Sequence, residues 1–228
     1  SEVVKSVVLE QYRSAMKLNG HELQGRNIIT YQVICKLVTD LIRKEEEFTF
    51  LGAEKPYRSV MTSNNCVINI GGTVDRQHLA NGKHFVVDYK TGKSHKTNVK
   101  GDVDEWLDKV FDTQTKAYDD YKAVIQTLIY CKIMKDLDVK AGRDTTYYCG
   151  IIFMQDIFKK DFTYEVTYND APLAYDTAFH EKFSAKLQSV IDKIFGEENL
   201  LCTNKQKCVP NFQSGNACIF YDICHRQK

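Results

Sequence analysis

The sequence predicts an α/β (α+β) domain in which helices flank a central run of strands. Helical segments open the chain, β-rich segments fill its middle, and long helical segments follow. A length of 228 residues is compatible with one large domain. Hydrophobic residues make up 43% and charged residues 27%, which is typical of a globular protein and excludes a disordered chain.

Helical periodicity marks four segments of the chain. Apolar residues recur at helical spacing from Glu2 to Leu18 and again from about Ile28 to Glu46. Two helices of this size cannot bury their apolar faces alone, so we expect them to cover one face of a sheet. Two further helices are predicted at about Tyr118 to Leu137 and Tyr175 to Phe195.

The segments between these helices are rich in β-branched and aromatic residues. They predict strands at Phe48–Ala53, Cys66–Gly71, Gly72–Leu79, Lys83–Lys90, Thr146–Met154 and Phe162–Thr167. The charged stretch Ser94–Asp104 is predicted to be a linker.

The dipeptide Asn81-Gly82 predicts a two-residue hairpin turn, because both residues tolerate the positive φ of a type I′ turn. Ala80 then pairs with Lys83 across the turn. The same register places Asp75 directly opposite Asp88, with their Cβ atoms ~4.5–5.5 Å apart.

Lys90 shares the sheet face of Asp88, because side chains alternate along a strand. The other face is expected to be core and carries Phe85, Val87 and Tyr89. Opposed like charges destabilise a hairpin, and a divalent cation bound by carboxylate oxygens would offset this. Two acids and a lysine on one face therefore predict metal-assisted hydrolysis. The alternative is a solvated sheet face with a surface salt bridge.

Three motifs in the sequence resemble those of a known family. GGTVDR at 71–76 and VVDYKTGK at 86–93 are similar to the core of the PD-(D/E)XK nuclease superfamily and, within it, to RecB/AddB-type nuclease domains. These domains continue with a helix carrying Q-x-x-x-Y, which Gln126 and Tyr130 match. The resemblance implies a restriction-endonuclease-like central mixed sheet flanked by helices.

The resemblance also implies a function. It indicates a metal-dependent DNA nuclease, of the exonuclease type, that acts in DNA repair or recombination with Mg²⁺ or Mn²⁺. It implies DNA as a partner, together with a helicase subunit or a helicase domain of the parent chain. One alternative is a catalytically inactive nucleic-acid-binding domain that keeps the nuclease fold. Another is a carbohydrate-acting enzyme with two carboxylates, although Lys90 has no role there.

Site roles follow from the resemblance by position. The expected metal ligands are Asp75, Asp88 and the backbone carbonyl of Tyr89, and the other catalytic residues are Lys90, Gln126 and Tyr130. Lys90 would position the attacking water or stabilise negative charge. Glu54 is a possible further acid on the strand before the hairpin. Many relatives carry an upstream G-x-x-x-H helix, which His21 does not match, so we expect that helix to lie upstream or to be absent.

The net charge is only +1, but charge is unevenly distributed. Residues 83–100 hold five lysines and one aspartate, whereas residues 101–120 hold seven acids and two lysines. A basic strip beside the carboxylates suits a phosphate backbone, and its expected DNA-binding residues are Lys93, Lys96 and Arg76. Unpaired bases could stack on the aromatic residues Tyr57, Trp106 and Tyr118.

The C-terminal tail, residues 200–228, carries four cysteines: Cys202, Cys208, Cys218 and Cys224. The last two match part of the iron–sulfur motif of AddB-type nucleases, but Gly215 stands where that motif has cysteine. We therefore expect neither an iron–sulfur cluster nor Zn²⁺.

The chain is interpreted as one domain over residues 1–228 with this tail, and as a piece of a longer polypeptide, since it lacks an initiator Met. No signal peptide is visible, and no apolar run reaches the ~18 residues of a membrane span. We expect a cytoplasmic protein that does not associate with a membrane.

Overall fold

A computed structural model describes residues 2–18, 23–112, 115 and 117–196 of the chain. Its helices are α1 (Glu2–Ala15), α2 (Arg26–Lys44), α3 (Val103–Val110), α4 (Ala117–Lys140) and α5 (Thr177–Phe195). Its strands are β1 (Thr49–Ser63), β2 (Cys66–Ala80), β3 (Lys83–Lys90), β4 (Asn98–Val99), β5 (Tyr147–Phe153), β6 (Thr167–Tyr168), β7 (Ala171–Pro172) and β8 (Ala174–Tyr175). No helix in these ranges is long and apolar enough to cross a membrane.

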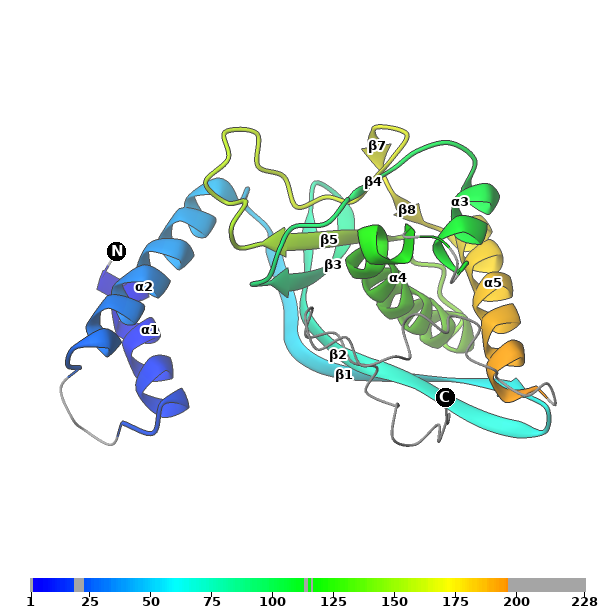
Figure 1. Ribbon diagram of the computed structural model, residues 1–228, viewed down its shortest axis with the longest axis horizontal. Helices are drawn as coiled ribbons and strands as arrows, with labels where there is room; N and C mark the ends of the chain where they lie inside the picture. Colours follow the sequence, from blue (N-terminus) through cyan, green and yellow to red (C-terminus); the bar gives the residue numbers. More distant parts are fainter. Residues whose placement is uncertain (1, 19–22, 113–114, 116, 197–228) are drawn as a thin grey trace, which may run out of the picture.

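The central sheet has the strand order β1-β2-β3-β5-β8. It is mixed, because β3 and β5 run parallel whereas the other neighbours run antiparallel. Helix α4 packs against the sheet, and α5 lies beside α4 (Figure 1). The predicted mixed sheet flanked by helices is therefore confirmed.

Strand β3 is buried on both faces, because a hydrophobic cluster covers each one. The larger cluster lies between the sheet and α3, α4 and α5, and it includes Val86 and Ile151. The smaller cluster on the reverse face includes Phe85 and Val87, as the alternation along the hairpin predicted, and Tyr89 packs against it. This double cover holds the end of β3, where Asp88 lies, in a fixed position.

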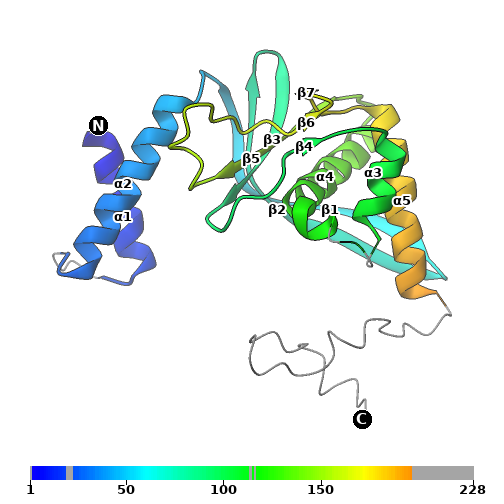
Figure 2. The ribbon, with the colours of Figure 1, turned by 45° about the horizontal axis from the view of Figure 1, so that its top comes forward.

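The prediction that the first two helices cover a sheet face is wrong for most of their length. Helices α1 and α2 pack on each other and project from the rest of the domain (Figures 1 and 2). Ile29 and Val33 of α2 are 63% and 51% exposed, and only the end of the helix reaches the sheet, where Leu41 joins the smaller cluster. Ile157 from the segment after β5 shares that cluster, so the end of α2 covers this face together with a loop.

The prediction of two separate strands at Cys66–Gly71 and Gly72–Leu79 is also wrong. They form the single strand β2, which pairs with β1 from Cys66 to Leu79 except at Asp75, and β1 extends far beyond the predicted Phe48–Ala53. Gly71 and Gly72 do not break the strand, because Arg58 and Tyr57 pair with them across the ladder.

Helix α3 replaces the end of the predicted linker at Ser94–Asp104. Asp102 caps it by accepting hydrogen bonds from the backbone N–H groups of Asp104 and Glu105. Its four buried apolar residues have helical spacing: Val103, Trp106, Leu107 and Val110. The predicted strand Phe162–Thr167 is reduced to a single bridge between Glu165 and Gly150, with the short β6 after it.

Candidate active site

The predicted hairpin register is confirmed. β2 and β3 pair from Ala80↔Lys83 to Arg76↔Val87, which leaves Asp75 and Asp88 at the next step, where the ladder ends. There the backbone N–H of Tyr89 donates a hydrogen bond to Asp75 Oδ2 at 2.8 Å. A side-chain contact thus continues the pairing and holds Asp75 at the end of β3.

A line of polar contacts runs from β3 to α4. Lys90 Nζ lies 2.7 Å from Asp88 Oδ2 and donates a hydrogen bond to Gln126 Oε1 at 2.8 Å. Gln126 Nε2 in turn donates to the hydroxyl of Tyr130 at 2.7 Å. Four residues that were predicted from separate motifs are therefore linked by a continuous series of side-chain contacts: Asp88, Lys90, Gln126 and Tyr130.

Asp88 occupies an unusual electrostatic environment for a carboxylate. Its side chain is 3% exposed, whereas that of Lys90 is 30% exposed. Burial raises the pKa of Asp88 and the neighbouring Asp75 raises it further, although Lys90 opposes both effects. The raised pKa shows that Lys90 alone does not fully compensate the buried negative charge.

The donor set fits a hard divalent cation. Asp88 Oδ2 is buried and, apart from its ion pair with Lys90, finds no hydrogen-bond partner among the described residues. The same residues contain no group of three or more His, Cys, Asp and Glu side chains that could hold a metal ion. Mg²⁺ does not require such a group, because it is commonly held by one or two carboxylates together with water and substrate phosphates. Asp75 and Asp88 supply two carboxylates of this kind at the end of the hairpin ladder.

Glu54 lies on β1 at the register position opposite Asp75, between the pairs Ala53↔Arg76 and Lys55↔Val74. Its backbone has a left-handed φ of 52°, and its side chain is exposed. Its assignment to the site stays a prediction.

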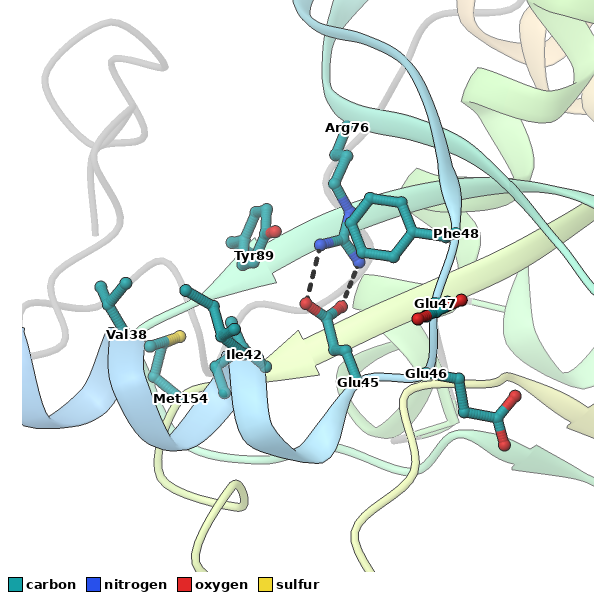
Figure 3. Close-up of a pocket in the computed structure, with 10 residues that line it drawn as sticks. Val38, Ile42, Glu45, Glu46, Glu47, Phe48, Arg76, Tyr89 and Met154 are labelled. Carbon is teal, nitrogen blue, oxygen red and sulfur yellow. Dashed lines mark hydrogen bonds and ion pairs between the residues drawn. The ribbon is translucent and has the colours of Figure 1, made fainter. Parts of the chain in front are cut away.

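The structure places Arg76 on the reverse face of the hairpin (Figure 3). Its guanidinium donates hydrogen bonds to both carboxylate oxygens of Glu45 and lies 4.7 Å from the ring centre of Phe48 and 5.5 Å from that of Tyr89. The side chains of Arg76 and Glu45 are 8% and 7% exposed. The predicted contact of Arg76 with DNA is therefore not available in this structure, because the cation is buried and paired.

Of the two lysines predicted to bind DNA, Lys93 lies beside the site, whereas Lys96 is engaged in an ion pair. Lys93 and Lys90 line one cavity of about 710 Å³. Lys96 Nζ is exposed and forms an ion pair with Asp120 at 2.7 Å. The same cavity is lined by His95, Tyr118 and Lys122.

Sequence reasoning did not assign His95 or Lys122 to the site. The four-residue spacing of Tyr118, Lys122 and Gln126 on one predicted helix is the signal that could have found Lys122. Of the other aromatic residues considered for stacking, Trp106 is buried in the larger cluster and Tyr57 accepts a hydrogen bond from Gln77 at 2.6 Å.

The acidic stretch that follows the basic strip is divided between two helices: Asp104 and Asp108 lie on α3, whereas Asp119 and Asp120 lie in the first turn of α4. Asp104 pairs with Lys182 of α5 at 2.5 Å, and Asp108 pairs with Lys186. These ion pairs attach α3 to α5, so the acids stabilise helix packing. The cysteines of the tail and His21 lie outside the described residues.

Comparison with known proteins agrees with this geometry. The model of the PD-(D/E)XK nuclease superfamily matches residues 3–225, which is nearly the whole chain. A comparison with curated proteins gives no match. The family match covers the hairpin with its paired carboxylates and lysine as well as the helix with Gln126 and Tyr130. The chain therefore belongs to the PD-(D/E)XK nuclease superfamily.

Proposed function

We propose that this chain is a metal-dependent deoxyribonuclease of the RecB/AddB exonuclease type that acts in DNA repair or recombination in the cytoplasm. The observation that carries the proposal is the line of contacts from Asp88 through Lys90 and Gln126 to Tyr130, with Asp75 held beside it. A helicase subunit, or a helicase domain of the parent chain, would supply the DNA strand. The nuclease nature of the family supports hydrolysis of phosphodiester bonds.

Asp75, Asp88 and the backbone carbonyl of Tyr89 would hold Mg²⁺ or Mn²⁺. When bound, such an ion lowers the pKa of a coordinated water and polarises a phosphoryl oxygen. The ammonium group of Lys90 lies 2.7 Å from Asp88 Oδ2, so it can orient the attacking water and stabilise the charge that develops on the phosphate. The carboxylates themselves provide the negative charge that attracts the cation.

Gln126 and Tyr130 keep Lys90 in place. The amide of Gln126 accepts from Lys90 through Oε1 and donates to Tyr130 through Nε2, so each end of the amide has a defined partner. A primary amide can satisfy both contacts in only one of its two orientations. Gln126 therefore restricts the ammonium group, and Tyr130 restricts Gln126.

A cleavage assay tests the proposal. End-labelled linear DNA, single-stranded and duplex, and a closed circular DNA would be incubated with Mg²⁺, Mn²⁺ or EDTA. We expect metal-dependent cleavage of linear DNA that falls by about 10²-fold or more in Asp88→Asn and Lys90→Met, because each removes an electrostatic contribution to the transition state. Lys140→Ala, which changes an exposed lysine at the far end of α4, is the matched control. An unchanged rate in either site variant contradicts the assigned roles, and cleavage of the circle contradicts the exonuclease assignment.

The alternative, a binding domain without catalytic activity, is favoured by one observation. The described residues contain two acidic side chains at the site and no larger group of metal-ligating side chains. Calorimetric titration with Mg²⁺ and Mn²⁺ separates the two functions. Binding that is lost in Asp88→Asn supports the enzyme, whereas DNA binding without metal binding or cleavage supports the alternative.

A further inference from the structure

A groove runs along α4 beside the line of polar contacts from Asp88 to Tyr130. It has a volume of about 710 Å³, and we call it the α4 groove. Its lining residues are Lys90, Gly92, Lys93, His95, Tyr118, Lys122, Ala123, Ile125, Gln126 and Ile129. In the part of the chain that the structure describes, no acidic side chain lines it. Three lysines, Lys90, Lys93 and Lys122, therefore line the groove together with apolar side chains, and Lys90 is also paired with Asp88.

The groove opens onto the site because of the helical repeat. Tyr118, Lys122 and Gln126 follow one another at intervals of four residues, which places them along one face of α4. From Tyr118 to Gln126 the helix rises by about 12 Å. Gln126 is bonded to Lys90, so the far end of this row meets the catalytic lysine.

The side chains of the row have the chemistry that binds a nucleotide. Tyr118 is 49% exposed in the first turn of α4 and presents an aromatic ring to solvent. Lys93 and Lys122 are exposed lysines on the same groove, and lysine is a point charge that binds phosphate. An aromatic ring beside cations is the arrangement that binds single-stranded nucleic acid, since a base stacks on the ring while its phosphate meets the charge.

We infer that the α4 groove binds unpaired nucleotides of a single DNA strand next to the scissile phosphate. Tyr118 stacks on a base, and Lys93 and Lys122 bind the adjoining phosphates. A base can stack on Tyr118 only after it leaves its partner strand, so the groove selects single-stranded over duplex DNA. A cavity of about 710 Å³ has the size of a small-ligand pocket, in the usual range of about 300–1,000 Å³. This assignment rests on the proposed function for the position of the cut.

Binding measured without catalysis tests the inference. Fluorescence anisotropy in EDTA would compare a labelled single-stranded oligonucleotide of twelve thymidines with a blunt duplex of equal length. Tyr118→Ala is expected to weaken single-strand binding about 10-fold, which is within the ~1–3 kcal/mol that a stacked base contributes. Tyr118→Phe keeps the ring and should bind as the unmodified protein does. Duplex affinity should not change in either variant.

The lysines are tested by the dependence of binding on salt. Lys122→Ala removes one phosphate contact, so the slope of log affinity against log salt for the single strand should decrease by about 0.7. Lys140→Ala lies on the same helix outside the groove and should leave the slope unchanged. Circular dichroism of each variant shows that the fold is retained.

The possible results distinguish a failure of the groove assignment from a failure of the proposed nuclease function. If Tyr118→Ala binds the single strand with full affinity, or loses single-strand and duplex affinity equally, the inference is overturned whether or not the protein cleaves DNA. If the predicted differences appear but no metal supports cleavage, the groove assignment stands and the proposed nuclease function fails.

Discussion

Arg76 donates hydrogen bonds to both carboxylate oxygens of Glu45, and this pair lies on the reverse face of the hairpin that carries the candidate site (Figure 3). Arg76 directly follows Asp75, and Tyr89, whose ring lies against the guanidinium, directly follows Asp88. Successive side chains point to opposite faces of a strand. The contact between Arg76 and Tyr89 on one face therefore helps to set the separation of the two carboxylates on the other.

Loss of one partner from this ion pair should be strongly destabilising. Glu45→Ala leaves the buried Arg76 cation uncompensated, which costs about 3–5 kcal/mol in comparable buried pairs. The double variant Glu45→Leu with Arg76→Met should recover much of that loss, because it removes both charges and keeps apolar volume. Urea unfolding of Glu45→Leu, Arg76→Met and the double variant measures the coupling free energy. Equal destabilisation by the double variant and by the sum of the single variants would show that the two residues do not interact.

The contact between Gly72 and Tyr130 makes Gly72→Ala a sensitive probe of the site. A Cβ at position 72 would lie 2.5 Å from Tyr130 Cε1, so the ring must move and its bond to Gln126 must change. Overpacking of this kind costs about 1–3 kcal/mol, and cleavage should decrease as well. The same substitution in a Tyr130→Ala background should have little further effect on either quantity, because the obstructing ring is absent. A similar loss in both backgrounds would contradict this explanation.

Gln126 should matter more than Tyr130 for cleavage. Gln126→Leu removes the hydrogen-bond acceptor of Lys90, whereas Tyr130→Phe removes only a partner of Gln126. We expect Tyr130→Phe to lower the single-turnover cleavage rate by about 10-fold or less, in line with the ~0.5–1.5 kcal/mol of one hydrogen bond. Gln126→Leu should lower it further. Rates at saturating DNA distinguish this from weaker binding, and a larger effect of Tyr130→Phe would reverse the assigned order.

The buried imidazole of His78 should make stability depend on pH. His78 lies among the rings of Phe48, Phe85 and Tyr164, and burial lowers its pKa to about 4, with further lowering by Arg76 and His84. Between pH ~4 and the unfolded value of ~6.5, the unfolded chain binds a proton that the folded chain does not. The free energy of unfolding should therefore fall as pH decreases through this window and change little above it.

The variant His78→Phe should flatten this pH dependence, since it keeps the ring and removes the titrating group. His84 and His180, whose pKa values burial also lowers, would contribute the slope that remains. Tyr164→Phe is the matched control, because it removes the 3.1 Å hydrogen bond to His78 without removing the imidazole. It should lower stability and keep the slope. Urea midpoints from pH 4.5 to 7.5 measure both, and an unchanged slope in His78→Phe would contradict the assignment.

Short-range patterns predicted the central part of the site. The Asn81-Gly82 turn fixes which residues of β2 and β3 oppose each other, and the ladder follows that register up to Arg76↔Val87. The spacing of four between Gln126 and Tyr130 places both on one face of α4, where they form a hydrogen bond. Such relations depend on a few neighbouring residues, so they can be derived without the tertiary structure.

Relations between distant segments were not predictable in this way. Arg76 resembled a surface cation beside a basic strip, but its partner Glu45 lies 31 residues earlier in the chain. Likewise, the apolar stripes of α1 and α2 suggested cover for a sheet, whereas the two helices pack mainly on each other. In both cases the sequence shows the charged residue or the apolar stripe, but it does not show which surface of the protein will contact it.

The sequence by itself determined the hairpin, its register, the helix that carries Gln126 and Tyr130, and the mixed α/β class, because backbone geometry and side-chain periodicity act over a few residues. Only the tertiary structure decided that α4 brings Gln126 within 2.8 Å of Lys90, that Arg76 turns inward to Glu45, and that Tyr118 and Lys122 line one groove. These arrangements depend on how separate elements pack to bury apolar surface and to compensate buried charge, which is a property of the whole chain.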